Sequence, residues 1–531
     1  MASSGANAAS PWPCVFDRRA HFWEDEEMTI GNAPKIEEEP PVGQKVLDES
    51  VLEAAAAVGD LELVEKCVRA GLGLEDLEDG ARSALEFAAA AGHAHCLDAM
   101  FVLAWKGRRD GGFEAFLLAA MAGKIECVRV FLQEKWRVSW SSGDFDEVME
   151  AAGSRGFADC LEECLLVAEA DGREALSWET ISQSAGFGGD GACLGVLMRR
   201  GRLVWERALL GAAEAGHGHS IDMLLSSVWE VEGPGVERAV NVAAGKGFAG
   251  CVERLMAACD PARREEAAYS GLRFAAKSGA VEVVKLLSSR CDASGRSFAE
   301  NGSTPLMCAA SSRKPGSAQC VEYLLPLSDL RRVDHNGRDP LMRAARSGFP
   351  KSVELLLGRF SGHWVDKAGM DALMHAACRG DAEAVGLLLD WSDASRKDSC
   401  GATALMWAAK KGAPESVAKL LSVSNPLERS ERGLTALIVA AWRGKAEAVR
   451  MLMDVSDPSC VDVAGVSASG AADRLAWSRN SDLVGMLAQW EAAGRERAEL
   501  WGVAGDRGGA AQGSGVEGVG PLVEKKRRPS L

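Results

Sequence analysis

Three groups of residues have types and spacings that could support chemistry. Gly186, Gly188 and Gly191 satisfy the G-x-G-x-x-G pattern of dinucleotide-binding loops, which requires a preceding strand and a following helix N-terminus aimed at the pyrophosphate. The segments 92–96 and 216–219 each carry two histidines, but a zinc site would need a third and a fourth ligand with tetrahedral reach. Six cysteines form a further recurring set: Cys96, Cys127, Cys160, Cys193, Cys251 and Cys320.

The elements that must position these groups are sequence repeats. Segments that begin at Gly337, Gly369, Gly401 and Gly433 are variations on one line, with Leu-Met or Leu-Ile before a later Ala-Ala, and each starts 32 residues after the last. A fixed period of this size indicates a stacked array, in which each unit buries its apolar face against its neighbours. The signature Ala-Ala-x-x-Gly continues towards the N-terminus, which predicts about 14 units between residues 51 and 490.

One unit is predicted to be two short antiparallel helices. Thr403 and its equivalents Thr304 and Thr435 can cap the first helix. Paired alanines allow the helix backbones of adjacent repeats to approach closely. Gly412 and its equivalents are expected to end the first helix in a left-handed turn, and the second helix carries apolar residues at helical spacing, such as Val417.

This unit resembles the ankyrin repeat, whose consensus contains Thr-Pro-Leu-His-x-Ala at a period near 33. The resemblance covers about four-fifths of the chain and is most specific from 302 to 453. It implies an all-α solenoid, curved and elongated, of helix-turn-helix units with short hairpin loops. The hairpin turn is poorly marked in several N-terminal units, which argues against regular hairpins there but not against the helix pairs. Methionine stands where the family has His, so we expect an apolar contact in place of the Thr–His hydrogen bond at Met307, Met342, Met374 and Met406.

The register of the repeat accounts for most of the apparent chemistry. The six cysteines share one slot that later repeats fill with Ser or Ala, and equivalent slots one repeat apart lie roughly 10 Å apart, too far for a disulfide. His93 and His217 follow a turn glycine, where the family commonly carries His. The glycine pattern falls on the turn of a worn repeat. We therefore expect no catalytic, cofactor-binding or metal-binding residue, and not an enzyme.

The composition of the chain limits which partners and which cellular locations are expected. The net charge of −16 over 531 residues disfavours nucleic acid and anionic membranes as partners. No apolar run approaches membrane-spanning length, and residues 1–16 lack the features of a signal peptide. We expect a cytoplasmic monomer with reduced cysteines. A basic cluster near the C-terminus leaves nuclear import as the alternative location: Lys525, Lys526, Arg527 and Arg528.

The predicted organisation has four parts. Residues 1–47 form an acidic arm expected to be disordered, residues 48–300 divergent repeats, residues 301–490 well-marked repeats with a capping unit, and residues 491–531 a Gly-rich, basic-ended disordered tail.

The resemblance implies partner binding on a concave face built from the first helices and hairpin tips. Basic residues precede the turn glycine from Lys246 onwards, through Lys277, to Arg479, whereas the first three repeats carry no charge there. Cations at helix ends also stabilise the helix by roughly 0.3–1 kcal/mol each, and tryptophan can either anchor an interface or pack on the next repeat. The predicted partner-binding residues are Arg343, Arg346, His375, Arg379, Trp407, Lys410, Lys411, Trp442 and Arg443.

The function favoured by the sequence is a non-enzymatic scaffold or adaptor that binds a partner protein with an acidic surface. Two alternatives remain open: a structural element of a larger assembly without a discrete ligand, and an enzyme or metal site in the divergent N-terminal units.

Overall fold

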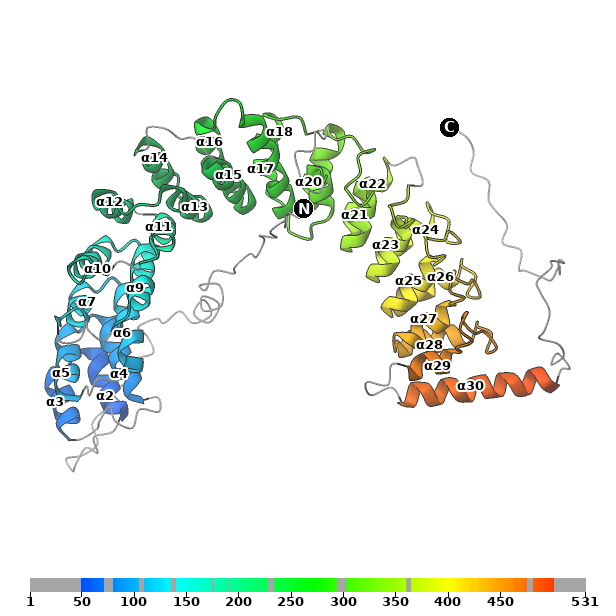
Figure 1. Ribbon diagram of the computed structural model, residues 1–531, viewed down its shortest axis with the longest axis horizontal. Coiled ribbons are helices and arrows are strands. Elements are labelled where there is room, and N and C mark those ends of the chain that lie inside the picture. The colour runs from blue at the N-terminus through cyan, green and yellow to red at the C-terminus, as the bar shows by residue number, and fades with distance from the viewer. Residues whose placement is uncertain are drawn as a thin grey trace, which may run out of the picture. The chain divides into compact units, whose positions relative to one another are not determined.

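The chain folds into helices that follow one another in pairs (Figure 1). The computed structural model describes residues 49–70, 80–104, 109–134, 140–173, 176–189, 191–227, 234–293, 302–359, 364–474 and 481–500. Within these ranges every regular element is a helix, which confirms the all-α prediction. The chain divides into two compact units: unit 1 is residues 1–309 with 314–329, and unit 2 is residues 310–313 with 330–531.

Unit 1 is a stack in which most first helices contact first helices and most second helices contact second helices. This arrangement lets each apolar face be buried by the neighbouring repeats. The pairs, in chain order, are α2 (Glu49–Val58) with α3 (Leu61–Arg69), α4 (Gly80–Ala91) with α5 (Ala94–Ala104), α6 (Arg109–Met121) with α7 (Ile125–Phe131), α9 (Ser142–Arg155) with α10 (Ala158–Ala170), α11 (Trp178–Phe187) with α12 (Ala192–Arg199), α13 (Trp205–Ala215) with α14 (Gly218–Ser227), α15 (Pro234–Lys246) with α16 (Ala249–Ala258), α17 (Arg264–Ser278) with α18 (Val281–Ser288), and α19 (Pro305–Ala310) with α20 (Ser317–Leu324), which the 3-10 turn η2 (Leu325–Leu327) follows.

Unit 2 repeats the same stacking with shorter first helices. Its pairs are α21 (Pro340–Ser347) with α22 (Pro350–Leu357), α23 (Ala372–Arg379) with α24 (Ala382–Leu389), α25 (Ala404–Lys411) with α26 (Pro414–Leu421), α27 (Ala436–Trp442) with α28 (Ala446–Met453), and α29 (Ala468–Asp473) with α30 (Ser481–Leu500).

Local signals fix where the first helices begin and end. The Thr403 hydroxyl accepts a hydrogen bond from the Met406 backbone N–H at 3.5 Å, and the Met406 side chain is buried. The helix then ends at Gly412, whose φ of 78° is left-handed and suits glycine because it has no β-carbon. The predicted threonine caps and glycine turns are thereby confirmed.

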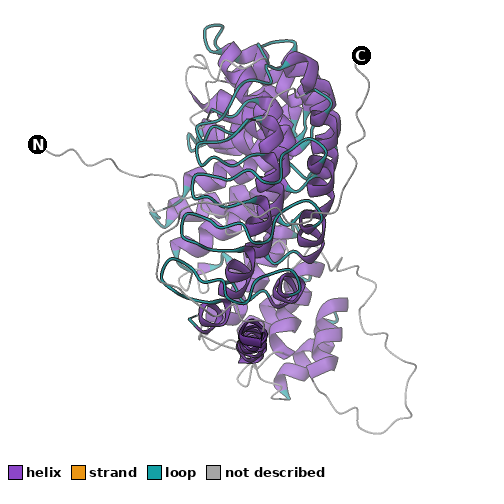
Figure 2. Cartoon of the chain, turned by 90° about the vertical axis from the view of Figure 1, so that its right-hand side faces the viewer, coloured by secondary structure: helices purple, strands orange, loops and turns teal. Residues whose placement is uncertain are grey.

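Hairpin loops stack on one another in unit 2 (Figure 2). The Asp366 carboxylate accepts from the backbone N–H groups of Ala368 at 2.9 Å and Met370 at 3.0 Å, which closes the loop. Each hairpin donates one backbone hydrogen bond to the hairpin before it, as Lys367 N–H does to Asn336 O at 2.9 Å. The same bond recurs one and two repeats later, so the hairpins form a continuous ladder.

Unit 1 reaches the same repeat length in a different way. Residues 358–371 connect α22 to α23, whereas residues 200–204 connect α12 to α13 and residues 259–263 connect α16 to α17. The first helices that follow these two short connections, α13 and α17, are longer than those of unit 2, so helix replaces hairpin there. Short hairpin loops were predicted for every unit, but these two fully described junctions lack them. This agrees with the weak turn signal in the N-terminal part of the sequence.

The last pair extends beyond the predicted boundary at residue 490. Helix α30 continues to Leu500, and Glu491 is buried against α29, where its carboxylate accepts from the Ser469 N–H at 2.8 Å and hydroxyl at 2.7 Å. The predicted N-terminal arm (1–47) and most of the tail, with its basic cluster at 525–528, lie outside the described residues.

Asp339 caps α21 from a buried position. Burial raises the pKa of its carboxyl from 3.8 to about 6. The folded protein then holds this proton at pH values where the unfolded chain has lost it. The stabilising contribution is therefore fully present below about pH 4 and is lost as the pH rises through about 6.

Replacing Asp339 with Thr, the residue that caps α25 and α27, should remove this pH dependence. Relative to wild type, we expect the unfolding free energy of Asp339→Thr to rise by roughly 1 kcal/mol between about pH 5 and pH 8. Urea unfolding at the two pH values, followed by tryptophan fluorescence, measures the change. A wild-type-to-variant difference that is the same at both pH values would contradict the assignment.

Candidate functional site

The paired histidines hold the turn of the preceding repeat. His93 Nε2 lies 3.2 Å from the Ala57 carbonyl oxygen, and His95 Nε2 lies 3.2 Å from the Gly59 carbonyl oxygen. The His93 ring also covers Gly59, because a β-carbon placed on that glycine would lie 2.5 Å from Nδ1. His217 covers Gly189 in the same manner. These contacts confirm the interpretation of His93 as a hydrogen-bonding turn histidine.

The recurring cysteines fill small buried slots. All six thiols are buried and none is in a disulfide, and burial raises the pKa of Cys127 to about 12 and that of Cys320 to about 11. Thiols of this kind stay protonated at neutral pH and are poor nucleophiles and ligands. Within the described ranges, no group of three or more His, Cys, Asp or Glu residues is placed to hold a metal ion.

The glycines of the G-x-G-x-x-G pattern serve helix packing. Gly186 lies inside α11, and a β-carbon there would overlap the Ala208 carbonyl oxygen of α13. Gly211 of α13 meets the Gln183 carbonyl of α11 in the reciprocal way. A dinucleotide fingerprint needs a strand before the first glycine, whereas here a helix contains it. The pattern therefore reflects two closely packed backbones.

Three of the predicted partner-binding residues instead secure the hairpins. Each lies nine residues after a buried loop aspartate. Arg343 Nη1 donates to Asp334 Oδ2 at 3.0 Å, and Trp407 Nε1 donates to Asp398 Oδ2 at 2.9 Å. His375 Nε2 lies 3.0 Å from Asp366 Oδ2. We name each pair a hairpin clip. The aspartates recur every 32 residues, so the sequence carried this signal, but their partners change type and the pairing was missed.

The hairpin clips determine which of the predicted partner-binding residues are accessible to a partner. His375 is 2% exposed, so its side chain cannot contact a partner, and we remove it from the proposed surface. Burial lowers the pKa of His375, although Asp366 acts in the opposite direction, and the ring is neutral at pH 7. Arg343 and Trp407 are half-buried and can offer only part of their surface.

Five basic side chains at or just beyond the ends of first helices remain open. In the described part of the chain, none of them has a carboxylate oxygen within 4.0 Å. Lys410 Nζ lies 4.0 Å from the centre of the Trp407 ring, and the guanidinium of Arg443 lies 4.6 Å from the centre of the Trp442 ring. Trp442 itself is 40% exposed. The five cations are Arg346, Arg379, Lys410, Lys411 and Arg443.

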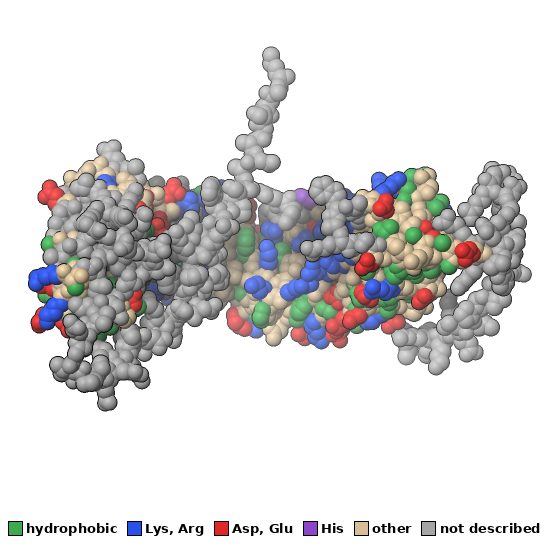
Figure 3. Space-filling view, turned by 90° about the horizontal axis from the view of Figure 1, so that it is seen from below, with side chains coloured by type: hydrophobic (Ala, Val, Ile, Leu, Met, Phe, Trp, Pro, Cys, Tyr) green, Lys and Arg blue, Asp and Glu red, His purple; other side chains and the backbone are tan. Residues whose placement is uncertain are grey.

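Several basic residues of unit 1 are, in contrast, ion-paired across adjacent repeats, although Lys277 has no ion pair among the described residues. Lys246, the equivalent of the open cations, lies 3.2 Å from a Glu214 oxygen. Arg254 lies 3.0 Å from Asp222, one repeat away. Figure 3 shows Lys and Arg side chains gathered on the face seen from below. Lys277 is exposed, and Arg479 lies outside the described residues.

The paired helices, glycine turns and stacked hairpins define an α-helical repeat protein. Residues 272–368 and 373–462 match the family model of ankyrin repeats (3 copies). The chain therefore carries ankyrin repeats, and we assign residues 272–462 to the ankyrin repeat family. Ankyrin repeats generally mediate protein–protein interaction. A search of curated proteins found no match to this chain. No helix in the described ranges is both long and apolar enough to cross a membrane.

Proposed function

We propose that this protein is a non-enzymatic scaffold or adaptor whose unit 2 binds an acidic partner protein. The binding surface consists of the five open cations together with Trp442, and we call it the basic–aromatic surface. The observation that supports it most directly is the absence of a carboxylate within 4.0 Å of any of those five cations, within the described residues. We further propose that the protein acts as a cytoplasmic monomer.

Helix-end stabilisation alone does not explain this pattern. A cation near a helix C-terminus contributes roughly 0.3–1 kcal/mol whether or not it has an acidic neighbour. Lys246 in unit 1 gains that contribution and is still neutralised by Glu214. In unit 2 the charges are left open on an otherwise acidic chain, where they can steer an acidic polypeptide at long range. Trp442 with Arg443 adds an aromatic and guanidinium pair of the type that dominates interface energies.

The proposal is tested by removing the open charges without touching the hairpin clips. The variant Arg379→Gln, Lys410→Gln, Lys411→Gln and Arg443→Gln should bind a fluorescein-labelled Glu-rich peptide roughly tenfold or more weakly than wild type at low salt. Wild-type affinity should fall as salt rises, because screening shortens the range of the attraction. Fluorescence anisotropy measures both effects.

A matched control changes the same number of charges in unit 1. Arg207, Lys246, Arg254 and Arg263 are all ion-paired, and their replacement by Gln should leave peptide binding within about twofold. Equal losses in the two variants would show that binding follows net charge spread over the array. That result would favour the structural-element alternative and overturn the assigned surface.

A further inference from the structure

Unit 1 contains a row of turn glycines, most of which are covered by a side chain of the next repeat. The residue after the next turn glycine supplies the cover. A β-carbon placed on Gly123 would lie 2.5 Å from a ring carbon of Phe157, and one on Gly216 would lie 2.8 Å from a ring carbon of Phe248. His93 and Lys124 cover earlier turns in the same way.

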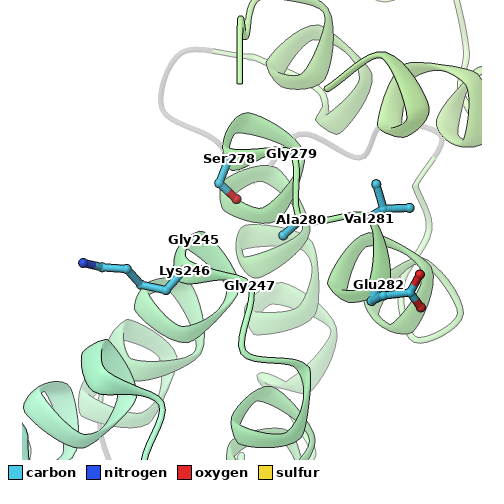
Figure 4. Close-up of a pocket in the computed structure, with 8 residues that line it drawn as sticks. All are labelled: Gly245, Lys246, Gly247, Ser278, Gly279, Ala280, Val281 and Glu282. Carbon is cyan, nitrogen blue, oxygen red and sulfur yellow. The ribbon is translucent and has the colours of Figure 1, made fainter. Parts of the chain in front are cut away.

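The cover is missing over Gly247. The next repeat places Ala280 at the covering position. A β-carbon placed on Gly247 would lie 3.5 Å from the β-carbon of Ala280, and, chain neighbours aside, no other described atom would lie within 4 Å of it. A cavity of about 320 Å³ lies there, lined by the turns at 245–247 and 278–282 (Figure 4). Ala280 thus leaves open a space that a larger residue fills at the equivalent junctions.

The rim of this cavity combines apolar and polar groups. Val281 contributes an apolar side chain to the lining, and Glu282, which also lines the cavity, is ion-paired with Lys285 Nζ at 3.0 Å. Lys246 points away from the cavity, towards its ion-pair partner Glu214. The Ser278 hydroxyl already donates to Ala275 O at 3.1 Å. The space between the two turns is therefore left to an occupant that needs no charged partner.

We propose that the Gly247 turn is a binding site for an aromatic side chain of a bound polypeptide. The same backbone turn holds a Phe ring over Gly123 and over Gly216, so the chain itself shows which group fits. This site lies in unit 1 and does not depend on the basic–aromatic surface.

Ligand-observed fluorine NMR on the full chain tests the site. The probe is N-trifluoroacetyl-L-phenylalaninamide, and the reference is N-trifluoroacetyl-L-alaninamide. We expect saturable broadening of the phenylalanine probe with a dissociation constant of about 1 mM, the range expected for a single small group. The alanine reference should show at least tenfold weaker binding.

Substitutions at Ala280 and at Phe248 should change probe binding in opposite directions. Ala280→Phe should cover Gly247 from within the chain and weaken probe binding at least tenfold, and Ala280→His should do the same with the residue found at His93 and His217. Phe248→Ala should uncover Gly216 and roughly double the probe bound at saturation. The proposal is overturned if both Ala280 variants bind like wild type, if Phe248→Ala adds no capacity, or if the alanine reference binds equally well.

Discussion

Replacing Gly186 with alanine is expected to destabilise unit 1 by about 3 kcal/mol or more. The added methyl group would overlap the Ala208 carbonyl oxygen of α13. Because that neighbour is backbone, no rotamer change relieves the overlap, and α11 and α13 must separate. Urea unfolding monitored by circular dichroism measures the loss, with hydrogen exchange to show that the weakened amides lie in these helices.

A matched control is available one helix further on. Gly195 lies inside α12, and a β-carbon there would meet only Arg199 Nη1, at an ordinary contact distance of 3.5 Å. Gly195→Ala should therefore be neutral or stabilise the unit by roughly 0.5–1 kcal/mol, because alanine favours helix. If Gly186→Ala were as mild as this control, the close packing of α11 on α13 would be wrong. A dinucleotide-binding role for the same glycines would instead predict intact folding.

Removing the hairpin clip at Asp366 should have the largest effect in unit 2. Asp366→Ala deletes the acceptor for the buried Met370 N–H and the buried His375 ring, and also for the part-buried Ala368 N–H. Buried partners left unsatisfied cost about 1–3 kcal/mol each, so we expect a total loss of roughly 3–5 kcal/mol. Tryptophan fluorescence during urea unfolding reports the change, and array proteins require more than one probe because repeats can unfold in segments.

The chain itself supplies the compensating change. In the next-but-one repeat Ser430 replaces the aspartate, Val439 replaces the histidine, and the Ser430 hydroxyl still accepts from the Leu434 N–H at 3.1 Å. The double variant Asp366→Ser with His375→Val should therefore recover about half of the loss, because no polar ring is left without a partner. Equal instability of the single and double variants would show that the clip does not act as a unit.

Features that every repeat must satisfy locally could be predicted from the sequence. The turn glycine, the Thr cap and the small-residue slot meet the same physical demand in each unit, so their recurrence revealed them. Cys127 and Ser352 share one slot because volume is what that position requires, and both are buried.

Features that depend on which side chains contact each other between repeats could not be predicted from the sequence. His375 and Trp407 were predicted to bind a partner from their place on the helix, but buried aspartates nine residues earlier hold them. The neutralisation of Lys246 by Glu214 depends on a residue one repeat away. The open turn at Gly247 becomes visible only when the covering residue of the next repeat is known.

The covering of most turn glycines of unit 1 by the following repeat gives the array a direction. Gly59 is completed by His93, and Gly92 by Lys124, so a repeat obtains its last contacts from residues that the ribosome adds later. At synthesis rates of about 5–20 residues per second, one further repeat takes roughly 2–6 s to add. A growing chain therefore always carries one unfinished turn at its leading edge, and a truncation at the C-terminal end exposes a turn that a truncation at the N-terminal end does not.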